Sequence, residues 1–111
     1  MNYISTRNKF LNFDFSSIFL RGLAPDGGLF IPNEIRKFNE NELKELSKLN
    51  YIDLGTEIIS KFCAPSLDKN KIKPLLDKAY SNFSSKNIVE MKQIDNINLL
   101  ELYHGPTLAF K

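Results

Sequence analysis

The residues best suited to chemistry lie in the last ten positions of the chain, where an apolar segment breaks at a turn and a lysine follows. The segment is Leu102-Tyr-His-Gly-Pro-Thr-Leu-Ala-Phe-Lys111. Its Gly105-Pro106 pair is a strong turn signal, and Thr107 could cap a helix that begins at Leu108. Apolar neighbours disfavour the charged form of a lysine, so the amine of Lys111 would be a better nucleophile toward a carbonyl. This is the environment that a Schiff-base lysine needs, although most lysines are simply solvated.

Two further groups of polar side chains could contribute to a site. His104 is the single histidine, and it could either pack within the turn or lie beside a bound molecule, which the residue type alone does not decide. Near the other end, Arg7 follows two hydroxyl residues, Ser5 and Thr6. Such a set could bind an anion, or it could simply supply the polar groups at the end of a strand. Thr107 suits a helix cap better than a reactant.

Composition describes an ordinary globular protein. Of the 111 residues, 42% are hydrophobic and 25% are charged, with a net charge of +2. This length favours one domain with a single modest core, and the absence of a basic cluster interleaved with aromatic residues disfavours nucleic-acid binding. Since no apolar run has the length of a signal peptide or a membrane span, we expect a cytoplasmic protein with no membrane partner. Cys63, the single cysteine, fits a small buried residue at a helix end better than a metal ligand, and we expect no metal site.

Two short strands and a short helix are predicted in the first third of the chain. Residues 3–6 have the pattern of a strand, and Asp14 could cap a helix that stops at Gly22. Residues 25–28, Pro-Asp-Gly-Gly, form a strong turn because proline fixes one backbone angle and glycine permits positive φ. Residues 29–31 then predict a second short strand.

Three helices are predicted in the middle of the chain. The apolar stripes have helical spacing, and the boundaries come from residues that cap or stop helices. In chain order these signals are a capping box of Asn39 and Glu42, with asparagine in place of the usual serine or threonine, a cap at Asp53, a stop at Pro65, and a cap near Asp68 for a helix that contains Pro74.

Two more strands complete the predicted fold. Residues 88–94 and 97–103 are joined by Asp95-Asn96, a pair suited to a tight hairpin turn. The chain as a whole is therefore predicted to be of the α+β class, with a small mixed sheet covered by about four helices. The order of the strands does not follow from the pattern.

Three segments resemble the threonine synthase family. Glu101-Leu-Tyr-His-Gly-Pro-Thr-Leu-Ala-Phe-Lys111 closely resembles the segment that carries the pyridoxal-phosphate lysine in these enzymes. Tyr3-Ile-Ser-Thr-Arg7 resembles the opening of the family, and Gly22-Leu-Ala-Pro-Asp-Gly-Gly-Leu-Phe-Ile-Pro32 resembles its first loop and strand. Asn8 stands where the family usually has glycine, a mild departure because asparagine also tolerates a left-handed conformation. The larger departure is that the continuation of the motif and the cofactor-binding domain are missing from these residues.

The resemblance implies how the chain is organised within a larger enzyme. Residues 1–103 would be the amino-terminal domain of a threonine synthase, and residues 104–111 would begin the active-site loop that leads into the catalytic domain. The full-length family is α/β and belongs to fold-type II of the pyridoxal-phosphate enzymes. The partner of this segment would therefore be the remainder of its own chain.

The resemblance also implies a reaction and the residues that carry it. Threonine synthases are pyridoxal 5'-phosphate-dependent lyases that convert O-phospho-L-homoserine and water to L-threonine and phosphate in threonine biosynthesis. Lys111 would hold the cofactor and move protons among the substrate carbons, and His104 would lie at the cofactor. Four residues would contact the substrate, namely Ser5, Thr6, Arg7 and Thr107.

Two other functions stay open at this point. A threonine-synthase-like phospholyase acting on another amino alcohol phosphate would keep Lys111 and change the substrate pocket. A non-catalytic interaction module would not need this lysine at all. Because the loop that would hold the cofactor phosphate is not among these residues, we expect the segment by itself to bind the cofactor weakly and to be inactive.

We expect residues 3–103 to fold on their own and residues 104–111 to stay unsettled without the rest of the enzyme. A first helical turn is costly to nucleate, and nothing in the segment continues it. Amide hydrogen exchange of the 111-residue chain at low concentration should show protected helices and fast exchange beyond Gly105. Slow exchange through Phe110 that does not depend on concentration would contradict this expectation.

Overall fold

The computed structural model describes residues 1–110. Its elements, in chain order, are β1 (Tyr3–Ser5), α1 (Phe15–Ile18), β2 (Phe30–Pro32), α2 (Glu40–Leu46), α3 (Tyr51–Cys63), α4 (Lys69–Tyr80), β3 (Glu90–Ile94) and β4 (Ile97–Glu101). Lys111, the predicted Schiff-base lysine, lies outside the described residues. Across residues 1–110, no helix combines the length and the apolar character that a membrane span requires.

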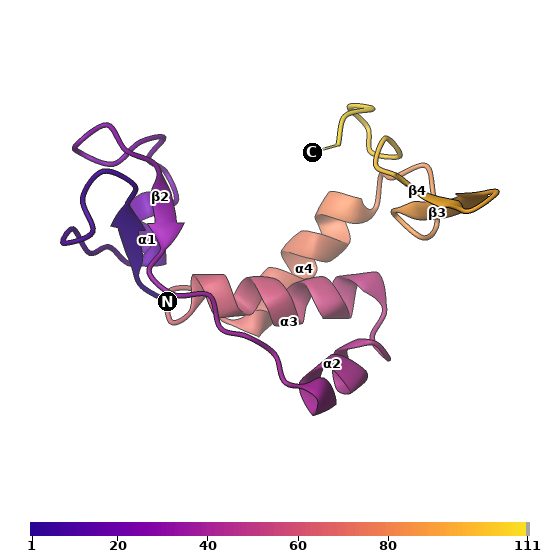
Figure 1. Ribbon diagram of the computed structural model, residues 1–111, viewed down its shortest axis with the longest axis horizontal. Coiled ribbons are helices and arrows are strands. Elements are labelled where there is room, and N and C mark those ends of the chain that lie inside the picture. The colour runs from indigo at the N-terminus through magenta and orange to yellow at the C-terminus, as the bar shows by residue number, and fades with distance from the viewer. Residues whose placement is uncertain (111) are drawn as a thin grey trace.

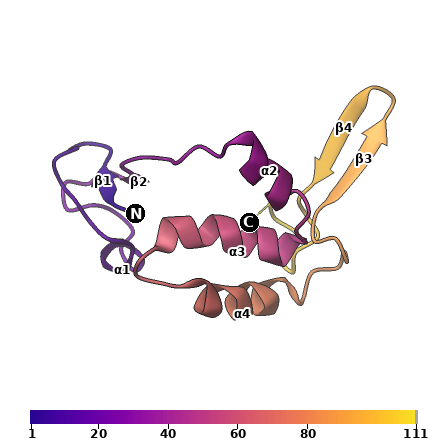
Figure 2. The ribbon, with the colours of Figure 1, turned by 90° about the horizontal axis from the view of Figure 1, so that it is seen from below.

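The strands form two separate sheets at opposite ends of a helical pair. β1 pairs with β2 and β3 pairs with β4, both antiparallel. Helices α3 and α4 lie between the two sheets, with α1 beside the β1–β2 sheet (Figures 1 and 2). The α+β class and the presence of four helices in the described chain are confirmed. The strands do not join into the single mixed sheet that was predicted, because α3 and α4 separate the two strand pairs.

The core is small and lies where the helical pair meets the strands. Tyr3 links β1 to the end of α3, because its hydroxyl donates a hydrogen bond to the carbonyl of Phe62 at 2.9 Å. Cys63 is buried as a free thiol at the end of α3, as the sequence predicts. The buried apolar side chains of the described residues are those of Tyr3, Ile4, Ala24, Cys63, Ile72 and Ile88.

The helix caps follow the predicted signals with one exception. Asn39 forms the expected capping box at the start of α2, and the carboxylates of Asp14 and Asp68 cap α1 and α4. For α3, the predicted cap at Asp53 is wrong. Asn50 caps this helix instead, and its side-chain oxygen accepts a hydrogen bond from the main-chain N–H of Asp53 at 2.9 Å. Asp53 thus lies in the first turn, where its negative charge interacts favourably with the positive end of the helix dipole.

Some of the other boundaries agree with the prediction and others differ from it. Helix α1 ends at Ile18, before the predicted stop at Gly22, whereas α3 ends just before Pro65 and α4 accommodates Pro74. The β3–β4 hairpin turns at the predicted pair, but β3 does not begin at Ile88. That residue has a φ of 69°, and a positive φ is incompatible with a strand.

A glycine lets the first loop approach β1 closely. The main-chain N–H of Thr6 donates to the carbonyl of Leu29 at 2.9 Å, and the N–H of Leu29 donates to Oγ1 of Thr6 at 2.9 Å. A Cβ atom on Gly28 would lie 2.1 Å from Oγ of Ser5 and 3.0 Å from Oγ1 of Thr6. The loop can therefore close on the strand only when residue 28 has no side chain, while Gly27 supplies the positive φ of the turn, 78°.

The Gly28→Ala substitution should destabilise the protein by about 1–3 kcal/mol, because the added methyl group overlaps groups that are held by hydrogen bonds. The matched control is Gly22→Ala, since a Cβ atom there would meet nothing within 4 Å, and its effect should stay within about 0.5 kcal/mol. Urea unfolding of both variants measures the difference. Equal unfolding midpoints for the two variants would contradict this account of the loop.

Candidate active site

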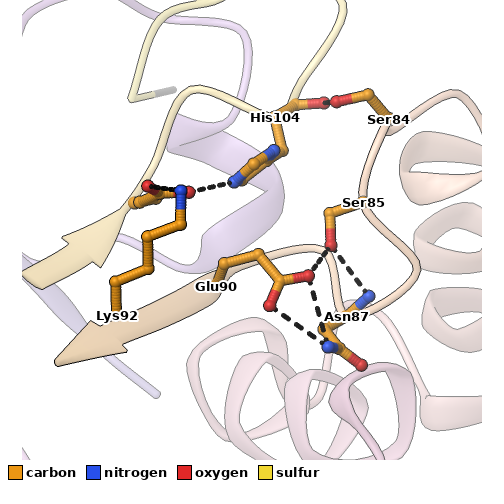
Figure 3. A network of polar contacts seen from close by, with 7 residues as sticks. Ser84, Ser85, Asn87, Glu90, Lys92 and His104 are labelled. Carbon is orange, nitrogen blue, oxygen red and sulfur yellow. Dashed lines mark hydrogen bonds and ion pairs between the residues drawn. The ribbon is translucent and has the colours of Figure 1, made fainter.

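The carboxyl-terminal candidate site is built around a carboxylate at the end of β4. Glu101 is the last residue of β4 and stands opposite Glu90, the first residue of β3. Only 4% of the Glu101 side chain is exposed. Lys92 Nζ lies 2.6 Å from Oε1 of Glu101, and His104 Nε2 lies 3.0 Å from Oε2 (Figure 3). One buried carboxylate thus binds a cation from β3 and the imidazole of the turn after β4.

These partners keep Glu101 ionised. Hydrogen bonds, first from Lys92 and then from Tyr103, lower the pKa of Glu101 to about 2, with a smaller contribution from His104. Burial acts in the opposite direction and is outweighed. The same carboxylate raises the pKa of Lys92 and that of Tyr103 through their hydrogen bonds with it. The site therefore centres on one fixed negative charge.

His104 is held by its main chain as well as by its ring. Its carbonyl accepts hydrogen bonds from the main-chain N–H of Ser84 at 2.8 Å and from the Ser84 hydroxyl at 3.1 Å (Figure 3). The ring of Tyr103 lies beside the imidazole, with 4.8 Å between the centroids. The structure thus supports the interpretation of His104 as a braced turn residue. Whether the ring also contacts a cofactor stays a prediction.

A second carboxylate ties the hairpin to the connector that follows α4. Glu90 accepts hydrogen bonds from the hydroxyl of Ser85 and from the side-chain amide of Asn87, the latter at 3.2 Å to each carboxylate oxygen (Figure 3). These bonds, that of Ser85 first, lower the pKa of Glu90. Ser84 and Ser85 therefore connect the same short segment to both the turn and the hairpin.

The chain beyond His104 forms a turn rather than the predicted helix start. The N–H of Leu108 donates to the carbonyl of Gly105 at 3.0 Å, and Leu108 has a φ of 57°. A positive φ cannot continue into a right-handed helix, so Thr107 is an exposed turn residue and not a helix cap. Gly105 is buried against Phe83, since a Cβ atom there would lie 3.0 Å from a ring carbon.

The amino-terminal candidate residues gather around another carboxylate, that of Asp26. Oγ of Ser5 donates to Oδ1 of Asp26 at 2.7 Å, and the N–H of Gly28 donates to the same oxygen at 3.0 Å. These two bonds, that of Ser5 first, lower the pKa of Asp26. A guanidinium nitrogen of Arg7 donates to the main-chain carbonyl of Asp26 at 3.0 Å. Within the described residues, Ser5, Thr6 and Arg7 thus hold the first loop in place.

The structure does not bring the two groups of predicted residues together. The β1–β2 sheet, which carries Ser5, and the turn around His104 lie at different ends of the helical pair (Figures 1 and 2). An anion-binding role for Ser5, Thr6 and Arg7 is neither supported nor contradicted by these contacts. Oδ2 of Asp26 is buried without a hydrogen-bond partner in the described chain.

Sequence reasoning misses the two carboxylates that organise these groups. Asp26 lies in a turn sequence, and the turn preference of aspartate already accounts for its presence there. Glu101 gives a clearer signal, because it interrupts an otherwise apolar run, Leu99-Leu-Glu-Leu102. An acidic residue at such a position has to find partners, and this could have identified Glu101 without a structure.

Comparisons with known proteins agree on one family. A family model described as Threonine synthase N terminus matches residues 2–80. Threonine synthase-like 2 of Xenopus laevis is 38% identical over 113 residues, which cover 100% of this chain and 24% of that protein. The threonine synthase of Schizosaccharomyces pombe is 37% identical, with 100% and 22% covered. The chain thus spans about a quarter of the length of these relatives.

Solved structures give the same result. The crystal structure of threonine synthase from Brucella melitensis, described as bound to pyridoxal phosphate (PLP), has a TM-score of 0.91 and 32% identity. The match covers 99% of this chain and 24% of that one. The threonine synthase from yeast has a TM-score of 0.89 and 34% identity, with 98% and 23% covered.

The low pKa of Glu101 should make the stability of the protein acid-sensitive. Its pKa is about 2 in the folded state, against an ordinary value of 4.5. The ionised carboxylate therefore favours folding, and this contribution is complete above pH 4.5 and is lost as the pH falls toward 2. The Glu101→Gln variant should have a lower Tm at pH 7 and a flatter dependence of Tm on pH between 4.5 and 2.

Thermal unfolding followed by circular dichroism measures both effects. Glu45→Gln is the matched control, since the Glu45 side chain is 73% exposed in its pair with Lys48 on α2, and exposed pairs contribute little. This control should keep the slope of the unsubstituted protein. A Glu101→Gln variant with that same slope would show that the carboxylate does not contribute in this way.

Proposed function

Since the chain belongs to the threonine synthase family, whose amino-terminal part it matches, we propose that it forms this part of an enzyme that converts O-phospho-L-homoserine and water to L-threonine and phosphate. The main support for the proposal is that His104, seven residues before Lys111, is held in a fixed position. Glu101 and Ser84 hold His104 by its ring and its carbonyl. We place the enzyme in the cytoplasm, with the remainder of its own chain as the partner of this segment.

The residues at this turn fit one side of a pyridoxal 5'-phosphate site. His104 uses Nε2 toward Glu101, which leaves Nδ1 as a second polar atom for a bound molecule. The turn at residues 106–108 is exposed, so a larger domain can cover it. When bound, the cofactor supplies an electron sink for negative charge on the substrate carbons. The cofactor phosphate and ring would require groups from the rest of the enzyme.

Each of the chain's own residues has a distinct role in this proposal. Lys111 would hold the cofactor and would move protons among the substrate carbons as a general acid and base. His104 contacts the cofactor from the turn, and Thr107 offers an exposed hydroxyl to the substrate. Arg7 is exposed and could bind the substrate phosphate. Ser5 and Thr6 would then act by holding Arg7 and its loop, since Ser5 has no exposed surface.

The second candidate is a phospholyase that acts on a different substrate. Relatives named threonine synthase-like 2 are as similar to this chain as those named threonine synthase, at 38% and 37% identity in the two cases above. Such an enzyme would retain the same lysine and turn. Phosphate release by the full-length protein from O-phospho-L-homoserine, compared with release from an amino alcohol phosphate, separates the two candidates.

The Lys111→Ala substitution in the full-length protein should abolish covalent attachment of the cofactor. Borohydride reduction followed by peptide mapping should place the reduced cofactor on Lys111 in the unsubstituted protein and on no lysine in the variant. Lys86→Ala is the control, because Lys86 is an exposed lysine of the connector before β3. Phosphate release should fall to background in Lys111→Ala only. A reduced cofactor that maps to another lysine would refute the assignment.

A further inference from the structure

We propose that Glu101 is a positioning residue, which fixes the imidazole of His104 in one tautomer and anchors the turn that precedes Lys111. Its catalytic meaning rests on the proposed function. The positioning itself depends on contacts among the described residues. Glu101 would not touch the substrate and would act through His104.

The two oxygens of the carboxylate have separate partners. Oε1 is 2.6 Å from Nζ of Lys92, and Oε2 is 3.0 Å from Nε2 of His104. Because the Lys92 contact occupies one oxygen, the carboxylate cannot turn toward other groups without losing a charge-assisted bond. The imidazole therefore meets a fixed acceptor.

A fixed acceptor determines the tautomer of a neutral imidazole. When Nε2 faces a carboxylate, the hydrogen of the neutral ring lies on Nε2, and Nδ1 becomes a hydrogen-bond acceptor. The His104 side chain is 16% exposed and that of Glu101 only 4%, so water cannot easily replace this bond. Glu101 thus decides which ring nitrogen accepts and which donates.

The main chain makes the same residue rigid. The carbonyl of His104 accepts two hydrogen bonds from Ser84, and Gly105 packs against the ring of Phe83. Residues 106–110 are exposed, and Lys111 follows His104 by seven positions. The segment that leads to the lysine therefore starts from a point whose ring, carbonyl and backbone are all held.

The tautomer of His104 can be measured directly in the full-length protein. Ring nitrogen shifts from ¹⁵N NMR, assigned by comparison with His104→Asn, should show the Nε2–H form in the cofactor-free protein. Glu101→Ala should show a mixture of tautomers. Lys92→Met should weaken the preference for the Nε2–H form without abolishing it, because it removes the ion pair that holds the carboxylate and leaves the bond between Glu101 and His104.

Kinetics then test whether this positioning matters for the reaction. Glu101→Ala should lower kcat by about tenfold to hundredfold with a smaller change in KM, since displacement of a positioned group by about 1 Å can cost a factor of about 10². Glu101→Gln should recover part of this loss, because its amide oxygen can still accept from Nε2. If Glu101 acts through His104, the double variant Glu101→Ala, His104→Asn should be no slower than His104→Asn alone.

Several outcomes would overturn the proposal. The Nδ1–H tautomer in the unsubstituted protein would do so even if Glu101→Ala did not fold. So would a single tautomer retained in Glu101→Ala, or a double variant whose loss is the product of the two single losses. If the unsubstituted protein releases no phosphate from O-phospho-L-homoserine, the proposed function is refuted instead. The tautomer measurement would still test whether Glu101 positions His104.

Discussion

The carboxylate of Glu101 is the interaction on which the carboxyl-terminal part of the chain depends. The β3–β4 hairpin is a two-stranded ribbon, which is marginal in water by itself, and most of its apolar side chains are exposed. Its base is held by Glu101 and Glu90, which bind groups from β3, from the turn and from the connector after α4. These polar contacts, together with the packing of Gly105 against Phe83, hold the turn that leads to the proposed cofactor lysine.

At both ends of the chain a carboxylate that accepts several hydrogen bonds holds a loop or turn in place, but its partners differ. At each end a carboxylate accepts from neutral donors: Asp26 from a hydroxyl and a main-chain N–H, and Glu90 from a hydroxyl and a side-chain amide. Asp26 closes a loop that can form only because Gly28 has no side chain. Glu101 differs from both because its partners include a lysine and an imidazole, and only the imidazole has proton chemistry near neutral pH. This difference is why the proposed chemistry lies at the carboxyl-terminal end.

Sequence reasoning succeeds where a structure is decided by neighbours along the chain. The caps at Asn39 and Asp68 are predicted because their bonds reach only three residues ahead. Asn50 and Asp53 are both good caps, and the pattern alone selects the wrong one. The positive φ of Ile88 depends on how the connector meets the hairpin, and the partners of Glu101 depend on the strand register. Neither is encoded locally, so the fold class follows from the sequence and the geometry of the site does not.

The separation of the two sheets by α3 and α4 has a consequence for how this chain folds. Each sheet pairs strands that are successive in the chain, and the central helices are also successive. The β3–β4 hairpin and the α3–α4 pair join residues that are near each other in sequence, and contacts of this kind lower the contact order. Chains of low contact order close short loops and fold quickly. The two ends can accordingly acquire their structure in parallel, each without waiting for the other.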